Sequence, residues 1–205
     1  MIDPSLFLDL GVALHGHKCP GMALGLRLGA EAMNALGVER ARDTQLLALL
    51  ELGDHHCTHC LADGVQIITG CTLGKENLIK LGYGKLGVTI VDRATKRAVR
   101  VVPRPEAQAA MRTTPFFTDY REKFVPFSAV PDMLVEPLVR KVLEAPREAI
   151  VQVGDIQRLD GPIQVTSLAT FRCERCGDLV AEPYGRLSAG SRLCIPCEEA
   201  TREKL

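Results

Sequence analysis

The sequence contains no apolar run of about 18 residues, the length that a membrane-spanning helix needs, so no membrane association is expected. Its first residues, MIDPSLFLDLG, lack the basic stretch and apolar run of a secretory signal, and we therefore expect a cytoplasmic protein. With 25 basic and 25 acidic residues it has no net charge, so no long-range field attracts nucleic acid. Internal repeats are absent as well. The remaining composition is that of a globular protein of 205 residues, one large domain or a domain with a small appendage.

Helix and strand signals alternate irregularly along the chain. The patterns predict helices at about 20 to 36 and 60 to 69, a strand at 45 to 52, a hairpin at 86 to 102, helices at 105 to 125 and 131 to 145, and strands within 148 to 159 and 162 to 171. Because no regular strand-helix-strand repeat is present, we expect an α+β fold.

The clearest chemical signal is a set of four cysteines near the C-terminus. Cys173 and Cys176 form one CxxC pair and Cys194 and Cys197 another, with 17 residues between the pairs. Since the cytosol keeps thiols reduced, two such pairs predict a closed tetrahedral Zn²⁺ site rather than disulfides. Gly177 suits the tight turn after the first pair, and the second pair opens a charged helix, as in a treble-clef finger. Acidic residues offset the finger's arginines, so nucleic acid is not favoured as its ligand.

A second candidate site lies near the N-terminus, in HGHKCPG. If this segment is extended, His15, His17 and Cys19 project to one side, and Pro20 predicts that Cys19 caps a helix whose dipole lowers the thiol pKa. All other histidines of the chain fall in DHHCTHC, residues 54 to 60. Three interpretations remain open: a metal site shared by the two segments, a reactive thiol without a metal, and a purely structural role.

The segment GCTLGKENL resembles a phosphate loop but does not match one. Gly70 and Gly74 enclose three residues rather than four, and Glu76 stands where a serine or threonine is needed after Lys75. An NTPase is therefore excluded. Lys75 remains a candidate for holding a substrate anion, and Cys71 for a thiol beside that cation.

Taken together, HGHKCPGMALGLRLG, CLADGVQIITGCTLGKENLIKLGYGK and the two C-terminal cysteine pairs resemble the FmdE-type family, which is named after a component of formylmethanofuran dehydrogenase. The resemblance implies an α+β core domain over residues 1–166 with an active site, followed by a treble-clef zinc finger over residues 167–205. The matched positions are His15, His17, Cys19, Pro20, Gly21, Cys60, Asp63, Gly70, Cys71, Thr72, Gly74, Lys75, Asn77 and Lys85. Glu76 departs from the family, whose members commonly have glycine there.

We therefore expect a metalloprotein with His17, Cys19 and Cys60 at the centre of a core-domain site, bound to Zn²⁺ or another transition metal, and with His15 as a further ligand. Cys19, Asp63 and Lys75 are the candidate catalytic residues, although the sequence does not decide whether the protein is an enzyme. The family resemblance suggests an accessory role beside a molybdenum or tungsten formylmethanofuran dehydrogenase. Two alternatives are a non-catalytic adaptor or metal-delivery protein and a redox protein that uses Cys19. The aromatic residues at 116 to 124 raise the prospect of a homodimer.

Overall fold

The structure, a computed structural model, describes residues 1–54, 59–159 and 169–202. It divides the chain into two compact units, Met1–Asp160 and Gly161–Leu205, called here the core domain and the C-terminal unit. The boundary predicted between residues 166 and 167 lies outside the described residues. No described helix has the length and apolar character needed to cross a membrane.

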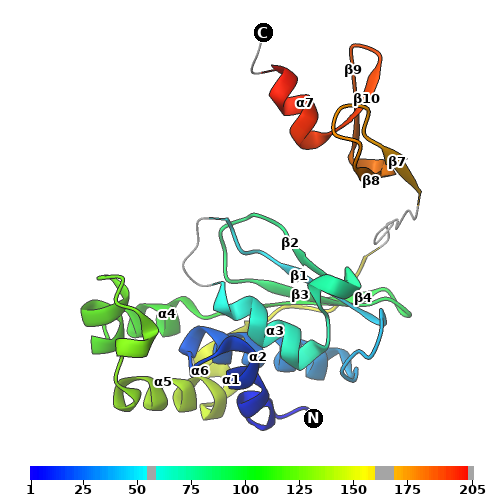
Figure 1. The fold of residues 1–205 in the computed structure, drawn as a ribbon. Coiled ribbons are helices and arrows are strands. Elements are labelled where there is room, and N and C mark those ends of the chain that lie inside the picture. The colour runs from blue at the N-terminus through cyan, green and yellow to red at the C-terminus, as the bar shows by residue number, and fades with distance from the viewer. Residues whose placement is uncertain (55–58, 160–168, 203–205) are drawn as a thin grey trace. The chain divides into compact units, whose positions relative to one another are not determined.

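The core domain is built on a mixed sheet (Figure 1). Its strands are β1 (Leu46–Leu50), β2 (Leu78–Lys80), β3 (Val88–Asp92), β4 (Arg97–Pro103), β5 (Val151–Val153) and β6 (Gln157–Arg158). The order is β2-β1-β3-β4-β5, and β6 pairs with β4. Only the β1–β2 pair among these is parallel, and α3 lies between these two strands in the chain. The predicted α+β class, the strand at 45 to 52 and the hairpin at 86 to 102 are confirmed.

The helices gather beside the sheet in Figure 1. They are η1 (Pro4–Phe7), α1 (Leu8–His15), α2 (Pro20–Leu36), α3 (Cys60–Thr69), η2 (Leu73–Lys75), α4 (Pro105–Arg112), η3 (Phe116–Arg121), η4 (Phe127–Ala129), α5 (Asp132–Glu144) and α6 (Arg147–Ile150). Two predicted helices end at glycines in the left-handed region, α2 at Gly37 (φ +69°) and α3 at Gly70 (φ +71°). Helix α1 is not predicted from the sequence.

The single helix predicted over residues 105 to 125 is wrong. Helix α4 ends at Arg112, and a short π-helix, η3, follows from Phe116. Pro115 stands between them; it has no backbone N–H to donate, and its ring disfavours the helical conformation of the residue before it. The apolar spacing continues across this break, which is why periodicity alone did not reveal it.

Helices α2 and α3 cross at two glycines. A Cβ atom on Gly64 would lie 2.0 Å from the carbonyl oxygen of Met22, and one on Gly25 would lie 2.1 Å from that of Leu61. Further along, a Cβ on Gly29 would meet Ile68. Residues later in α2 contact residues later in α3. The two helices therefore run in the same direction, and their N-termini lie at the same end. This crossing brings the N-terminal residues of the two helices together.

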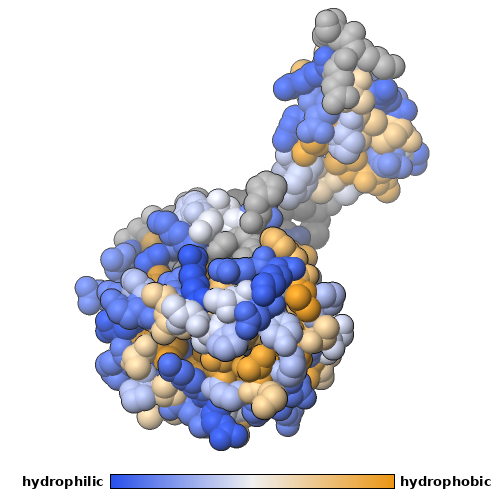
Figure 2. All heavy atoms as spheres, turned by 90° about the vertical axis from the view of Figure 1, so that its left-hand side faces the viewer, coloured by the Kyte–Doolittle hydropathy of each residue, from blue (hydrophilic) through white to orange (hydrophobic). Residues whose placement is uncertain are grey.

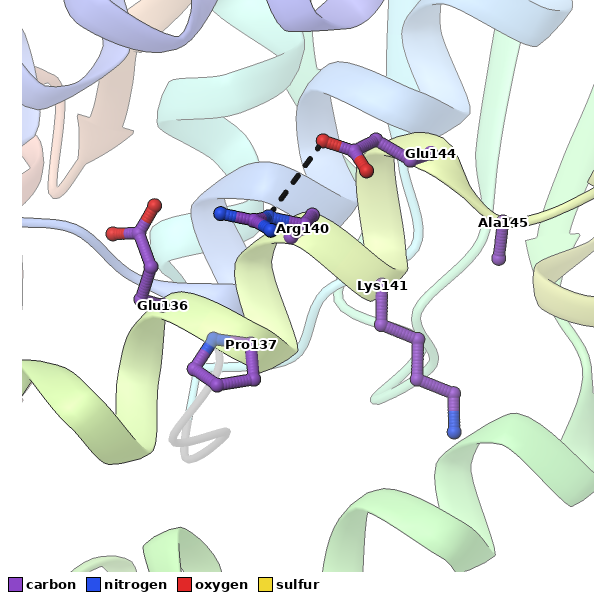
Figure 3. Close-up of a pocket in the computed structure, with 6 residues that line it drawn as sticks. All are labelled: Glu136, Pro137, Arg140, Lys141, Glu144 and Ala145. Carbon is purple, nitrogen blue, oxygen red and sulfur yellow. Dashed lines mark ion pairs between the residues drawn. The ribbon is translucent and has the colours of Figure 1, made fainter.

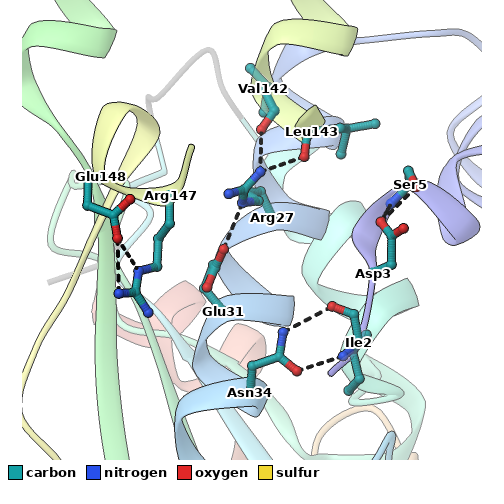
Figure 4. A network of polar contacts seen from close by, with 10 residues as sticks. All are labelled: Ile2, Asp3, Ser5, Arg27, Glu31, Asn34, Val142, Leu143, Arg147 and Glu148. Carbon is teal, nitrogen blue, oxygen red and sulfur yellow. Dashed lines mark hydrogen bonds and ion pairs between the residues drawn. The ribbon is translucent and has the colours of Figure 1, made fainter. Parts of the chain in front are cut away.

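A buried arginine joins α2 to the end of α5 (Figure 4). Arg27 is 7% exposed and donates to the carbonyl oxygens of Val142 (3.4 Å) and Leu143 (2.5 Å) and to the carboxylate of Glu31 (2.9 Å). The last carbonyls of a helix have no partner within it and carry its negative dipole end. The guanidinium therefore supplies hydrogen-bond donors to the carbonyl groups of the last turn of α5.

We expect Arg27→Met to lower the free energy of unfolding by about 2–4 kcal/mol, because it leaves two carbonyls and a carboxylate without their donor. Urea denaturation followed by circular dichroism measures the change. Arg140→Met is the matched control: Arg140 lies on α5 with its side chain 64% exposed, and its loss should change stability by less than about 0.5 kcal/mol. Equal losses in the two variants would contradict the assignment.

The C-terminal unit consists of two hairpins and a helix. Strands β7 (Thr170–Arg172) and β8 (Leu179–Ala181) form the first hairpin, and β9 (Gly185–Ser188) and β10 (Ser191–Cys194) form the second. A short η5 (Glu182–Tyr184) joins them, and α7 (Ile195–Arg202) follows. A cysteine turn, a hairpin and a helix in this order form the arrangement predicted from the cysteine spacing.

Candidate metal sites

The four C-terminal cysteines lie in one cluster. The sulfur atoms of Cys173, Cys176, Cys194 and Cys197 are all within 4.8 Å of one another. Cys173 lies at the start of a turn that Gly177 completes with φ +80°. The amide of Cys194 donates to the Cys173 sulfur at 3.3 Å. The amide of Cys176 and this one hold the pKa of Cys173 below its usual value, as expected for a thiolate that ligates a metal. The geometry fits a closed four-sulfur Zn²⁺ site.

The second cluster is formed by His15, His17 and Cys19 in the core domain. One ligand atom from each lies within 4.8 Å of the other two. His15 is the last residue of α1, Gly16 reverses the chain with φ +89°, and Cys19 is the N-cap of α2. The three side chains converge because the chain turns at Gly16 between two helices. The three predicted residues therefore lie together, but not in the extended segment that the sequence analysis assumed, because His15 is helical and Gly16 is left-handed.

Cys60, the first residue of α3, lies beside Cys19 because α2 and α3 run in the same direction. The neighbouring Cys60 thiol is the main reason that the pKa of Cys19 is lowered; burial opposes this effect, and His15 lowers the pKa further. The pKa of Cys60 is raised, first because of Cys19 and then by burial. The amides of Gly21 and Met22 also favour the Cys19 thiolate, although they fall outside strict hydrogen-bond geometry, so their effect is that of a helix dipole.

Asp63 orients His15. Its Oδ2 lies 2.7 Å from Nδ1 of His15, whose side chain is 14% exposed, which leaves Nε2 of the imidazole for another partner. The pKa of His15 is raised to about 9, mainly by its hydrogen bond with Cys19 and, after the opposing effect of burial, by Asp63. A carboxylate on one ring nitrogen is the usual support of a metal-ligating histidine.

His17 carries the most informative atom of the cluster. Its Nε2 is buried and has no hydrogen-bond partner in the described part of the chain. Its ring is packed between His15, at 4.4 Å between ring centres, and Phe127, at 4.1 Å. A buried polar atom left unpaired costs about 1–3 kcal/mol. Such an orphaned imidazole nitrogen beside a thiolate fits a site for a metal ion.

Other predicted site residues lie elsewhere. Lys75 and Cys71 follow the C-terminus of α3, a helix about 14 Å long whose other end carries Cys60. Lys75 Nζ donates to the carbonyl of Arg42 at 3.3 Å, and burial raises the pKa of the Cys71 thiol. The structure therefore does not bring Lys75 to the His/Cys cluster.

The second histidine segment is only partly described. His59 Nε2 bonds to the carbonyl of Gly53 at 2.7 Å, and Asp54 pairs with Lys80. His55, His56 and Cys57 lie outside the described residues.

Two residues near the cluster were not predicted from the sequence. Phe127 packs on His17, and the guanidinium of Arg121 lies over the Phe127 ring at 4.8 Å from its centre. Both come from the segment after Pro115, about a hundred residues beyond His17. No local pattern in the sequence connects that segment with HGHKCPG.

The aromatic residues that suggested a homodimer differ in exposure. Phe116 is buried, Phe117 and Tyr120 are half-buried, and Phe124 is 85% exposed. Figure 2 views the core domain from the side of α4, and hydrophobic side chains reach the surface there among hydrophilic ones. The homodimer stays a prediction, supported mainly by Phe124.

The hollow drawn in Figure 3 is separate from this chemistry. It measures about 480 Å³ and is lined by one end of α5 and the residue that follows, Glu136, Pro137, Arg140, Lys141, Glu144 and Ala145. Arg140 and Glu144 form an exposed ion pair across it at 3.9 Å. Glu136 also pairs with Lys18, which joins α5 to the loop that carries His17. Neither of the two clusters described above contributes a residue to its lining.

Comparison with known proteins identifies the family. Residues 14–152 match the family described as "FmdE, Molybdenum formylmethanofuran dehydrogenase operon". The chain belongs to the FmdE family. Residues 167–201 match the "Prokaryotic dksA/traR C4-type zinc finger". The resemblance inferred from the motifs is confirmed, and this FmdE protein is a metal-binding chain with a C4-type finger after its core domain.

The FmdE chain is also similar to a solved structure and to a curated protein. A solved FmdE-like protein from Syntrophus aciditrophicus, named for a tungsten formylmethanofuran dehydrogenase, has a TM-score of 0.64 and 21% identity, covering 97% of this chain and 93% of that one. This likeness confirms the fold. A "Probable S-adenosyl-L-methionine-binding protein" of Archaeoglobus fulgidus is 36% identical over 197 residues, which are 89% of this chain and 50% of the relative. The FmdE chain thus spans about half the length of that curated relative.

Proposed function

We propose that this FmdE protein holds a second metal ion in its core domain, bound by His15, His17 and Cys19 with Cys60 beside them. The observation that carries the proposal is the buried, unpartnered Nε2 of His17 in a cluster of imidazole and thiolate groups. Mixed nitrogen and sulfur donors suit Zn²⁺ and also accept iron or nickel. A site with three or four such ligands supplies, when loaded, a Lewis acid for a bound water or substrate.

The residues of the chain have distinct roles in this proposal. Cys19 supplies a thiolate that the α2 N-terminus favours, Asp63 fixes the His15 ring through Nδ1, and Phe127 covers one face of His17. Asp63 is 41% exposed, so water reaches this edge of the cluster and a proton can pass between His15 and solvent. These are the properties of a reactive site rather than of a sealed structural one.

We further propose a cytoplasmic accessory role beside a molybdenum or tungsten formylmethanofuran dehydrogenase, or a related reaction. The family description and the solved relative's name support this proposal. In an adaptor function the finger would dock a larger dehydrogenase, and co-purification with such a complex would favour it. The ligand named for the archaeal relative is not assigned to this chain, because half of that protein lies outside the match.

A thiol redox function is the second candidate, and the closeness of the Cys60 thiol to Cys19 favours it. Here the two thiols would form one S–S bond and pass two electrons and two protons to a disulfide or quinone oxidant. Mass spectrometry of unreduced, alkylated protein tests it. A fully alkylated Cys19 and Cys60 would exclude this function.

Metal content tests the main proposal. We expect about two equivalents of metal per chain in the wild type and about one in His17→Phe, in Cys19→Ser and in Cys173→Ser. Phenylalanine at position 17 keeps a ring against Phe127 but removes the ligand nitrogen. Elemental analysis of the full chain measures the equivalents, and Cys71→Ala is the control because that buried thiol lies at the other end of α3.

The stability of His17→Phe separates a metal site from a structural histidine. If the cluster binds no metal, replacing an unpaired buried nitrogen by carbon raises the melting temperature. If it binds metal, the variant melts lower than the metal-loaded wild type and no longer responds to a chelator at this site. A higher melting temperature together with one equivalent of metal in the wild type would overturn the proposal.

A further inference from the structure

Arg121, the last residue of η3, finds no polar partner for its guanidinium within residues 1–54, 59–159 and 169–202. Among the described residues it makes neither an ion pair nor a side-chain hydrogen bond, although it is half-buried. The contact that its side chain does make there is with the face of Phe127. By contrast, the buried Arg27 and the exposed Arg100 are each paired with a carboxylate, Arg100 in a two-pronged contact with Glu51. Its five N–H donors are therefore open to a ligand from solution.

The Arg121 guanidinium lies near the His/Cys cluster. The Arg121 Cζ is 4.8 Å from the centre of the Phe127 ring, and that centre is 4.1 Å from the centre of the His17 ring, so the guanidinium is at most about 9 Å from the imidazole. Its positive charge also acts on the Cys60 thiol, where it lowers the pKa against the larger opposing effects. Arg121 is thus close enough to share one small ligand with the cluster.

The backbone around Arg121 is shaped unusually. Residues Phe116–Arg121 form a π-helix, a rare conformation that is frequent at functional sites. The turn that ends it places Phe124 at φ +54°, a left-handed conformation that costs a bulky residue about 1–2 kcal/mol. Such strain persists where the geometry it produces is needed, here the placement of Arg121 and Phe127 beside His17.

We propose that Arg121 binds the carboxylate of a small organic anion whose other end lies at the His15, His17 and Cys19 cluster. A guanidinium matches a carboxylate through two parallel hydrogen bonds, and the Phe127 face holds its plane in position. Because the guanidinium is at most about 9 Å from the His17 imidazole, a short dicarboxylate with two to four carbons between the bound carboxylate and the cluster falls within reach of both. This inference rests on the proposed metal site, and it assigns to Arg121 the anion-holding role that the sequence suggested for Lys75.

Calorimetric titration of the metal-loaded full chain tests the proposal, with malonate and succinate as probes and malonamide as the uncharged analogue. We expect the dicarboxylates to bind and malonamide not to bind. Arg121→Gln should weaken dicarboxylate binding by about 10- to 100-fold with metal content unchanged, and Arg121→Lys should restore part of it. Lys123→Gln is the matched control, because it removes one exposed positive charge from the same segment and should bind like the wild type.

Each outcome decides the matter. Equal binding by wild type and Arg121→Gln, equal binding of malonamide and malonate, or no dicarboxylate binding by the wild type would overturn the proposal while the metal content still supports the core site. A wild type with one equivalent of metal would defeat the metal site. In that case binding that still depends on Arg121 would support the anion site by itself.

Discussion

Replacing Gly64 with alanine is expected to lower the free energy of unfolding of the core domain by about 3 kcal/mol or more and to abolish metal binding at the proposed His/Cys site. The added Cβ would lie 2.0 Å from the Met22 carbonyl oxygen and 2.6 Å from the Leu26 amide nitrogen. Both atoms are backbone of α2, so neither can yield by a rotamer change. Alanine gains about 1 kcal/mol over glycine in helix propensity, which is too little to offset this overlap.

Gly64→Ala should also disturb the His/Cys cluster, because the α2–α3 crossing sets the distances between its side chains. If α3 moves away from α2, Cys60 moves away from Cys19, and Asp63 moves away from His15, which belongs to α1. Thermal unfolding and metal analysis measure the two effects on one sample. Gly74→Ala is the control, since no atom lies within 4 Å of its added Cβ and its φ is not positive. Unchanged metal content in a destabilised Gly64→Ala would show that the crossing does not position the ligands.

The parts of the fold that were predicted correctly depend on local rules. Pro20 and Gly37 mark the two ends of α2, and Gly70 ends α3, because each residue's backbone preference acts within one helical turn. The finger was predicted for the same reason, since a CxxC pair bends around one ion by itself. The short α1 was missed because its sequence, LDLGVALH, has an apolar pattern too brief and too uniform to identify.

The residues that pack beside the His/Cys cluster could not be predicted from local rules. Phe127 and Arg121 reach His17 through tertiary packing across about a hundred residues, and neither stands in a recognisable motif. Lys75 shows the opposite case. It stands in a motif beside a thiol, but the length of α3 separates it from Cys60. Motif proximity along the chain therefore predicted which proposed ligand residues lie together better than it predicted the charged residue near them.

Replacing Cys173 with serine is expected to unfold the C-terminal unit and leave the core domain folded. In the described part of this unit only Phe171 and Leu193 are buried apolar residues besides Cys173, so packing alone cannot hold the two hairpins and the helix. In fingers of this size the free energy of zinc binding is the free energy of folding. A serine at position 173 removes one of four thiolates and the acceptor of the Cys194 amide.

Limited digestion with trypsin measures this unfolding, because Arg172, Arg175, Arg186 and Arg192 lie within the finger. The wild type should be cut slowly at these sites until a chelator is added, whereas Cys173→Ser should be cut quickly from the start. Cys19→Ser is the matched control. It removes a ligand of the proposed core-domain metal site and should leave the finger resistant to trypsin. The chain divides into two compact units, so the core fragment should survive digestion in every case. Rapid cleavage of the core domain in Cys173→Ser would mean instead that the zinc of the finger also stabilises the domain that carries the His/Cys cluster.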